Sequence, residues 1–276
     1  MSLRFGPRLA PMREAYVQRD NPSFEAQLER RTADLAASAL LPHLRPGMRL
    51  LDMGCGPGSI TLDLAAVVAP GAVVGIDIQP ALVERARELA DERGTTNVRF
   101  EVADVNTLDI EAQFDAAFAH MVLMHLPDPV GVLTRIRRAL TPSGVIGVLD
   151  PDLGTTVRWP SSPVWERFLE LRLRAHEHQG SDGRIGRKHR EVLRAAGFAR
   201  TEGRARTRGQ GTAEQTHEHA RWLKTQIVGF GRIAIAEGWA DRSELDAMAA
   251  DIDAWAERPD AFFFTVICET LGWVRA

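Results

Sequence analysis

Residues 48–59 read Met-Arg-Leu-Leu-Asp-Met-Gly-Cys-Gly-Pro-Gly-Ser, and this stretch decides the fold of the 276-residue chain. Its apolar start predicts a short strand that ends in a carboxylate, Asp52. Three glycines follow at alternate positions, Gly54, Gly56 and Gly58, before a helical pattern begins. Glycine adopts φ > 0 without strain and leaves room for a ligand against the main chain. A strand that turns this sharply into a helix presents such a ligand at the carboxyl edge of a parallel sheet.

The same alternation of strand and helix continues along the chain. Five repeats of an apolar strand followed by a helix predict a parallel, doubly wound α/β sheet. Two later strands extend it to a mostly parallel, seven-stranded sheet with helical additions. The expected strands are 48–52, 72–77, 98–102, 114–119, 145–149, 198–206 and 261–269, and the expected helices are 60–68, 80–93, about 130–140, 163–178, 187–196, two within 213–257, and one that begins at Asn21-Pro22 and runs towards Pro42.

Composition and charge are those of an ordinary globular protein, with 45% hydrophobic and 26% charged residues. The formal net charge of −3 gives no electrostatic reason to expect nucleic acid or an anionic membrane as a partner. The sequence shows neither a signal-peptide pattern nor a run of about 18 apolar residues. Two isolated cysteines, Cys55 and Cys268, predict no disulfide framework. We therefore expect a cytoplasmic protein.

No pattern in the sequence predicts a metal site. The two cysteines are far apart, and four of the eight histidines form two i,i+2 pairs. Side chains at this spacing diverge on a helix, so His176 and His178 are not expected to share a ligand, nor are His217 and His219.

The glycine turn and the carboxylate of Asp52 resemble motif I of the class I S-adenosylmethionine (SAM) methyltransferases. Residues 114–129 resemble motif IV of the same class, and residues 46 to about 150 are similar to its ubiquinone/menaquinone-biosynthesis group. The resemblance implies a Rossmann-like methyltransferase fold that binds SAM and releases S-adenosylhomocysteine (SAH). It also implies three parts: an N-terminal helical lid segment at 1–45, a SAM-binding core at 46–160, and the remainder of the sheet at 161–276 with a helical substrate-lid insertion at about 210–258.

A dinucleotide-binding turn is the weakest alternative to a SAM-binding turn. The dinucleotide fingerprint G-x-G-x-x-G fits Gly54 and Gly56, but its third glycine position is occupied by Ser59. SAM has no pyrophosphate and carries a cationic sulfonium and an ammonium group, so Asp52 beside the turn suits SAM better than NAD. A tight strand-to-helix turn without any ligand is the remaining interpretation.

The resemblance implies further cofactor contacts at the ends of the second and third strands. Asp77 would accept hydrogen bonds from both ribose hydroxyls, although a solvated loop aspartate is the alternative. Asp104 would accept from the adenine amino group while the next backbone N–H meets a ring nitrogen, and a helix or turn cap is its alternative role. The implied cofactor-binding residues are Asp52, Gly54, Gly56, Gly58, Asp77, Ile78, Ala103, Asp104, Val105 and His120.

Methyl transfer by in-line displacement mainly requires alignment, which can supply roughly 7–11 kcal/mol. An acceptor that loses a proton also needs a base, typically contributing about 10²–10⁴-fold. His125 and His120 are the candidates because imidazole titrates near neutral pH. As alternatives, His125 packs under the cofactor and His120 contacts it through its backbone alone. Tyr16 would reach the SAM carboxylate or the acceptor if its helix folds over the opening, and is otherwise an ordinary amphipathic tyrosine.

Asp150 and three tryptophans are the expected contacts for the acceptor. Asp150 ends the fifth strand, at the carboxyl edge of the sheet, where acceptors bind. Trp159 and Trp165 follow this strand, and Trp222 lies in the helical addition. A lid rich in aromatic side chains favours a flat or apolar acceptor. Trp255, at helical spacing, is expected to belong to the core.

The sequence therefore predicts a methyltransferase of secondary metabolism that acts on a small, apolar or aromatic metabolite. Oxygen, nitrogen and carbon all remain open as the acceptor atom, and both a monomer and a homodimer remain open as the assembly. An RNA or protein methyltransferase is one alternative, but the basic run at 204–208 is better explained as a solvated strand edge. A non-catalytic SAM-binding protein is another alternative.

Overall fold

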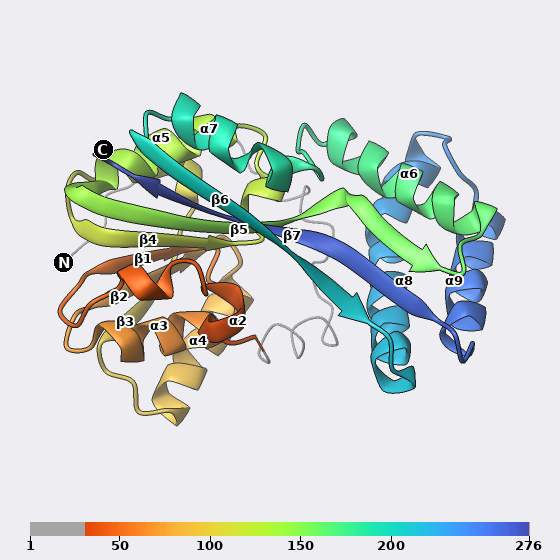
Figure 1. Ribbon diagram of the computed structural model, residues 1–276, viewed down its shortest axis with the longest axis horizontal. Coiled ribbons are helices and arrows are strands. Elements are labelled where there is room, and N and C mark those ends of the chain that lie inside the picture. The colour runs from red at the N-terminus through yellow and green to blue at the C-terminus, as the bar shows by residue number, and fades with distance from the viewer. Residues whose placement is uncertain (1–30, 276) are drawn as a thin grey trace.

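The computed structural model describes residues 31–275. Seven strands form one sheet in the order β3-β2-β1-β4-β5-β7-β6. The neighbouring pairs from β3 to β5 are parallel, and β7 runs antiparallel to both β5 and β6. Helices cover both faces of this sheet (Figure 1). The expectation of a doubly wound, mostly parallel seven-stranded sheet is confirmed.

The helices and strands follow the expected order. The strands are β1 Leu50–Met53, β2 Val73–Asp77, β3 Val98–Val102, β4 Phe114–His120, β5 Leu140–Trp159, β6 Arg200–Gln210 and β7 Phe262–Trp273. The α-helices are α2 Ala33–Ala36, α3 Ser59–Val68, α4 Pro80–Glu92, α5 Pro129–Ala139, α6 Pro163–His178, α7 His189–Ala195, α8 Ala213–Ala236 and α9 Arg242–Ala256. Short 3₁₀ turns are η2 Leu41–His43, η3 Val105–Thr107, η4 Leu123–His125 and η5 Ile185–Lys188.

Four of the described α-helices, α5, α6, α8 and α9, begin at a side chain that accepts from a free backbone N–H of the first turn. The Asp128 carboxylate accepts from the backbone N–H of Gly131 at the start of α5, where Pro129 occupies the first helical position. Thr212 and Gln215 form a reciprocal capping box at the start of α8. These caps fix the points at which the chain leaves the sheet.

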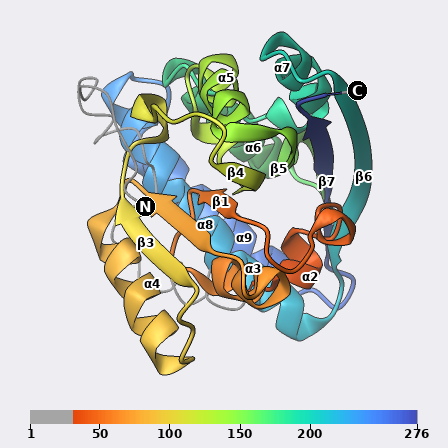
Figure 2. The same cartoon turned by 90° about the vertical axis from the view of Figure 1, so that its left-hand side faces the viewer.

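Successive residues of each central strand face opposite sides of the sheet, and each side is covered by its own helices. Leu51 lies in a core with residues of α5 and α7, whereas Leu50 lies in a core with residues of α2 and α3. Figure 2 shows α5 and α7 on one face of the sheet and α2, α3 and α4 on the other. The parallel strands are thus buried on both faces.

Three strands extend beyond the parallel core. β4 pairs with β5 only as far as Leu149, but β5 continues to Trp159 along β7, which itself pairs with β6. In Figure 1 these strands carry α6, α8 and α9 beyond the parallel part of the sheet. The three helices share one core that includes Trp165, Leu223 and Ile252. Because β5 projects from its carboxyl end, these helices lie beyond the edge of the sheet where a ligand is expected.

The expected limits of the last three strands are wrong, because all three strands are longer than expected and end later in the chain. β5 continues past 149 through Asp150, Pro151 and Gly154, residues that normally indicate the end of a strand. The pairing of β5 with β7 shifts register between Asp152 and Val157, which accommodates this irregular segment. Strand length is therefore set here by pairing with a distant segment and not by local composition.

The described part of the N-terminal segment differs from the expected continuous helix. α2 ends at Ala36, and the 3₁₀ turn η2 follows. Leu40 and Leu44 pack in the same core as Leu50, against α3. Residues 31–45 thus contribute to the main core, while Tyr16 lies outside the described residues.

Within residues 31–275, no helix has both the length and the apolar character needed to cross a membrane.

Candidate active site

The turn between β1 and α3 is tied to the end of β2. Gly54, Gly56 and Gly58 have φ values of +72°, +55° and +85°. The backbone N–H of Gly56 donates to Oδ2 of Asp77 at 3.0 Å, and Oδ1 of Asp77 accepts from the backbone N–H of Gln79 at 2.9 Å. Burial raises the pKa of Asp77, and these backbone N–H groups oppose the rise. The structure thus brings the glycine turn and Asp77 together at one edge of the sheet.

Two of these glycines have no room for a side chain. A Cβ on Gly54 would lie 2.5 Å from Cγ2 of Val122, in the loop after β4. A Cβ on Gly58 would lie 2.8 Å from the ring of Phe100 and 2.9 Å from Ala86. The turn therefore requires glycine for close packing as well as for positive φ.

Asp52 lies under this turn and is buried. Its Oδ2 accepts a hydrogen bond of 2.6 Å from the Thr61 hydroxyl of α3. Burial raises the pKa of Asp52 to about 7; the Thr61 hydrogen bond opposes this rise, and the nearby charge of Asp77 adds to it. A buried carboxylate with a pKa near neutrality is the kind of group that a nearby cation would convert to its charged form.

The ends of β2 and β3 expose apolar side chains beside Asp77. Ile78 is 43% exposed and Val102 is 42% exposed, although both are large apolar residues. Sequence reasoning included Ile78 but did not assign a role to Val102. Asp104 caps η3, since its Oδ1 accepts from the backbone N–H of Asn106 at 2.9 Å. Ala103 and Val105 lie partly buried on either side of Asp104.

The end of β4 approaches this edge through His120 and Met121. Met121 has φ of +56°, which is uncommon for a residue other than glycine and is often found at functional sites. His120 Nδ1 lies 3.4 Å from Arg31 Nη1. Because a guanidinium only donates, Nδ1 accepts, and the proton of the neutral ring then resides on Nε2. Burial lowers the pKa of His120 well below its usual range, as do the charges of Arg31, Arg208 and Arg206.

His125 lies in η4, one turn beyond the end of β4, and contacts α6. Its ring stacks on that of His176 with the centroids 5.8 Å apart. Burial lowers the pKa of His125 to about 4, and the charge of Arg172 contributes to the shift. Burial likewise lowers the pKa of His176 to about 3. Both imidazoles are therefore neutral at physiological pH.

Asp150, in β5, is hydrogen-bonded to the backbone of η4. Its Oδ1 accepts from the backbone N–H of Met124 at 3.2 Å, and its Oδ2 lies 3.0 Å from His189 Nε2. Burial raises the pKa of Asp150, and the His189 hydrogen bond opposes the rise. The side chain is 0% exposed. The structure thus places Asp150 as a support for the turn that carries His125, not at the surface where an acceptor contact was expected.

The three tryptophans expected at the acceptor site have different surroundings. Trp165 is 1% exposed and stacks on Phe168 at 5.0 Å, inside the core of α6, α8 and α9. Trp159 is exposed, and its carbonyl oxygen accepts from the Trp255 indole N–H. Trp222 is partly buried and stacks on His219 at 5.1 Å. The structure therefore does not bring the three indoles together, and Trp255 belongs to the core as expected.

Sequence reasoning missed a group of polar residues on α6 and α8 around Arg172. Arg172 is buried, and its guanidinium carbon lies 5.1 Å from the centre of the Trp222 ring. Its charge lowers the pKa values of His125, His176 and His219, adding to the larger effect of burial. No local signal could have identified it, because arginine at helical spacing is ordinarily an exposed residue.

The histidine pairs diverge as expected. His178 faces Trp239 and His176 faces His125, while His217 pairs with Glu257 and His219 packs on Phe263. Among residues 31–275, no group of three or more His, Cys, Asp or Glu side chains is arranged to hold a metal ion.

The basic run of β6 also has partners. Arg204 and Arg206 both donate to the Glu269 carboxylate of β7, at 2.7 and 2.6 Å for the shortest contacts. Arg208, further along the same strand, is exposed. The run is an exposed strand edge whose first two arginines share the single carboxylate of Glu269.

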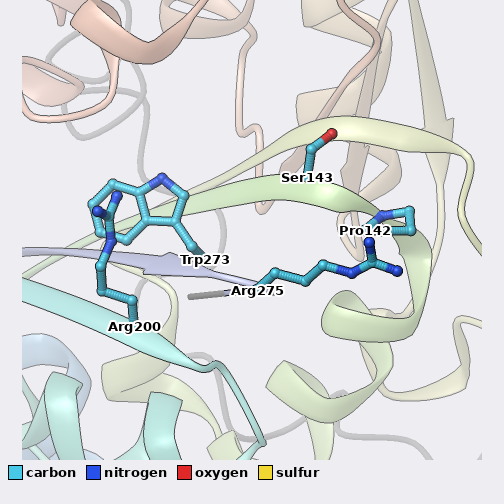
Figure 3. A pocket seen from close by; sticks show the side chains of 5 residues that line it. All are labelled: Pro142, Ser143, Arg200, Trp273 and Arg275. Atoms are coloured by element: carbon cyan, nitrogen blue, oxygen red, sulfur yellow. The ribbon is translucent and has the colours of Figure 1, made fainter.

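One pocket lies far from this edge. It is lined by Pro142, Ser143, Arg200, Trp273 and Arg275, beside the start of β5 and the end of β7 (Figure 3). The Arg200 guanidinium covers the Trp273 ring at 3.7 Å. Because the start of β5 is the amino end of the parallel sheet, this pocket is separate from the carboxyl edge described above.

Comparison with known proteins gives the family. The model of the family described as "Methyltransferase domain" matches residues 44–182. Among curated proteins, the chain is similar to an uncharacterized methyltransferase from Schizosaccharomyces pombe, with 29% identity over 167 residues that cover 58% of this chain and 60% of the relative. It is also similar to a trans-aconitate 2-methyltransferase from Methylobacterium nodulans, with 38% identity over 129 residues that cover 47% of each protein. An aklanonic acid methyltransferase from a Streptomyces species is 39% identical over 107 residues, which cover 38% of this chain and 49% of the relative.

The solved structure of the YcgJ protein from Bacillus subtilis shares the fold, with a TM-score of 0.58 at 18% identity, covering 88% of this chain and 99% of that chain. The chain spans only 60%, 44% and 47% of the length of the first three curated relatives. The family match covers half of the sequence, and the chain belongs to this family of methyltransferase domains.

Proposed function

We propose that this protein is a SAM-dependent methyltransferase that acts on a small organic metabolite. The observation that carries the proposal is the junction of the glycine turn with Asp77, where bare main chain and a carboxylate meet at the carboxyl edge of the sheet. The names of two relatives, trans-aconitate 2-methyltransferase and aklanonic acid methyltransferase, indicate small-molecule acceptors and support this substrate class.

The residues at this edge fit the chemistry of an aminoacyl-nucleoside. Asp77 is a hydrogen-bond acceptor suited to ribose hydroxyls, and the exposed apolar side chains of Ile78 and Val102 are suited to the faces of an adenine ring. The backbone at 103–105 and the partly exposed Asp104 offer polar groups for the edge of the base. Asp52 supplies negative charge near the turn, where the cationic part of SAM would lie.

When bound, SAM would supply a methyl group activated by its sulfonium: the lone pair of an acceptor atom would bond to the methyl carbon as the carbon–sulfur bond breaks and SAH leaves. The residues of the chain then have to orient the acceptor and receive its proton. In this proposal His125 is the base, because burial keeps its imidazole neutral at physiological pH. His120 donates from Nε2 instead, since Nδ1 already accepts from Arg31. Asp150 positions His125 through the backbone N–H of Met124.

We also propose a methyltransferase subgroup and an acceptor class for this protein. Membership of the ubiquinone/menaquinone-biosynthesis group, and an apolar or aromatic acceptor, rest on the motifs and on the partly buried Trp222. The exposed Trp159 and the core residue Trp165 do not support direct contacts with the acceptor.

Calorimetric titration with SAM, SAH and NAD tests the cofactor class. We expect saturable binding of SAM and SAH and none of NAD; tight binding of NAD without SAM would overturn the proposal. Transfer of a labelled methyl group from SAM to a panel of small acids, phenols and amines tests the substrate class. Incorporation into RNA or protein, with no small molecule labelled, would favour a macromolecular methyltransferase instead.

A further inference from the structure

Arg172 is a buried cation on α6, in a helical layer that lies beyond the carboxyl edge of the sheet. Arg172 is 6% exposed. Its Nη2 donates to Oε1 of Gln226 on α8 at 3.3 Å, and its guanidinium faces the ring of Trp222 at 5.1 Å. An amide oxygen and an aromatic face are both neutral partners. Burial lowers the pKa of Arg172 to about 10, which still leaves the group charged.

No carboxylate within residues 31–275 forms an ion pair with Arg172, and its buried Nε has no hydrogen-bond partner there. A second buried arginine in the same layer, Arg158, differs in having a counter-charge, although its Nε and Nη1 also have no hydrogen-bond partner among the described residues. Arg158 is 3% exposed and donates to the Asp251 carboxylate at 2.7 Å. Because a buried charge without a counter-charge is costly, the unpaired state of Arg172 requires a reason that Arg158 does not.

The side chains around Arg172 leave its charge uncompensated. Burial lowers the pKa values of His125, His176 and His219, and the charge of Arg172 adds to the shift of each, after a larger effect of His125 on His176 and of Arg208 on His219. Their rings are neutral at physiological pH, so the cluster carries the single positive charge of the guanidinium. His219 is 7% exposed, and its Nε2 also has no hydrogen-bond partner among the described residues. Two buried nitrogens of the cluster thus have no hydrogen-bond partner within residues 31–275.

The cluster reaches the site of methyl transfer through its histidines. Arg172 and His176 are four residues apart on α6 and so lie on the same face of the helix. His176 stacks on His125, which follows the end of β4 at the carboxyl edge. A ligand group held by Arg172 would therefore lie on the acceptor side of that edge, beyond the residues that fit the nucleoside.

We propose that Arg172 binds a carboxylate of the acceptor, so that the small molecule methylated by this protein is an organic acid. The inference rests on the proposed function and specifies its substrate class. The planar guanidinium fork matches a carboxylate with two parallel hydrogen bonds, which a single ammonium cannot reproduce. The Trp222 ring holds the guanidinium from its face and leaves its edge for the ligand. The acceptor is then a molecule with an apolar body and one anionic end.

Matched pairs of probes test this assignment without knowledge of the acceptor. Benzoate, trans-cinnamate and decanoate are titrated, each beside its primary amide, into the full-length protein saturated with SAH, and binding is followed by calorimetry and by tryptophan fluorescence. We expect at least one carboxylate to bind about 10- to 100-fold more tightly than its amide, the range expected of a hydrogen bond to a charged group. Arg172→Gln should remove this preference and leave the affinity of the amide within about twofold.

Two further variants separate charge from fold. Arg172→Lys keeps the charge without the fork and should retain part of the preference. Arg174→Gln is the matched control, because Arg174 lies on the same helix, is exposed, and covers the Trp239 ring instead; it should behave as the wild type. If Arg172→Gln no longer binds SAH, the variant has lost its fold. The inference is then judged from the carboxylate-to-amide preference of the wild type and of Arg172→Lys.

Equal binding of carboxylate and amide by the wild type would overturn the inference, as would a preference that survives in Arg172→Gln. Failure of every carboxylate to bind at millimolar concentration would also overturn it. Failure of the wild type to bind SAH or SAM is a different result, because it removes the proposed function itself.

Discussion

The carboxylate of Asp77, at the end of β2, accepts a 3.0 Å hydrogen bond from the backbone N–H of Gly56 in the turn after β1. One oxygen therefore holds the glycine turn in place, and the other accepts from Gln79 at the start of α4. A single side chain thus joins two neighbouring strand ends at the edge of the sheet. Loss of this carboxylate should disturb the turn and the proposed ribose contact together.

Asp77→Ala is expected to weaken SAM binding by about 10- to 100-fold, the effect of losing hydrogen bonds to a charged group. Asp128→Ala is the matched control, because its carboxylate also accepts from a backbone N–H, that of Gly131 at 2.8 Å. Loss of this helix cap should cost about 1 kcal/mol of stability and leave SAM affinity unchanged. Calorimetry on both variants measures the difference. Equal losses of affinity would count against the ribose role of Asp77.

Gly54→Ala and Gly94→Ala separate the two demands on glycine in the turn. Both residues have positive φ, +72° and +61°, but an added Cβ meets Val122 at 2.5 Å only in the case of Gly54 and meets nothing within 4 Å at Gly94. Gly94→Ala should cost about 1–2 kcal/mol for the left-handed conformation. Gly54→Ala should cost more and should also abolish SAM binding. Urea unfolding gives the two free energies, and similar values would mean that Val122 moves aside freely.

Local signals in the sequence were enough to predict the parallel core. The glycine turn at 54–58 and the apolar run of β2 each act within a few residues, and the structure has β1, β2, β3, α3 and α5 within two residues of their expected limits. Trp255 was likewise recognised as a core residue from helical spacing alone.

Contacts between distant segments could not be predicted in this way. β5 extends beyond Leu149 because β7 pairs with it, although its own Pro151 and Gly154 argue against a strand. The Asp150 carboxylate is hydrogen-bonded to His189, 39 residues further along the chain. The ring of His125 in η4 stacks on that of His176 in α6. Composition gives no indication of these partners, so the role of each polar residue emerged only from the fold.

His125→Ala is expected to lower kcat by about 100-fold for an acceptor that loses a proton, with SAM affinity unchanged. His178→Ala is the control, since this residue lies on the same helix as His176 but faces Trp239. Burial lowers the pKa of His125 to about 4, so its imidazole is already neutral throughout the range near pH 7. The wild-type kcat should therefore fall only below about pH 5, without an inflection at the usual histidine value. An inflection near pH 6.5 that disappears in His125→Ala would contradict this assignment.

Asp52 should make the stability of the free protein depend on pH in the opposite sense to the buried histidines. Burial raises the pKa of Asp52 from 3.8 to about 7, against the opposing effect of the Thr61 hydrogen bond. Between these two values the folded state binds the Asp52 proton more strongly than the unfolded state does. The stabilisation is therefore fully present below pH 3.8 and is lost as the pH rises to about 7. The histidines have lowered pKa values, so their contribution instead improves as the pH rises.

Asp52→Asn isolates the carboxylate from the histidines, because the amide oxygen still accepts from Thr61 and never ionises. The histidine effects are common to both proteins and cancel in their difference. Relative to the wild type, the variant should gain free energy of unfolding as the pH rises from about 5 to 8, by no more than about 1.4 kcal/mol for each pH unit. Urea unfolding without SAM, repeated across this range, gives the difference directly. A difference that does not vary with pH would mean that Asp52 ionises at its ordinary value in the folded protein, and its charge would then be present at the turn before SAM binds.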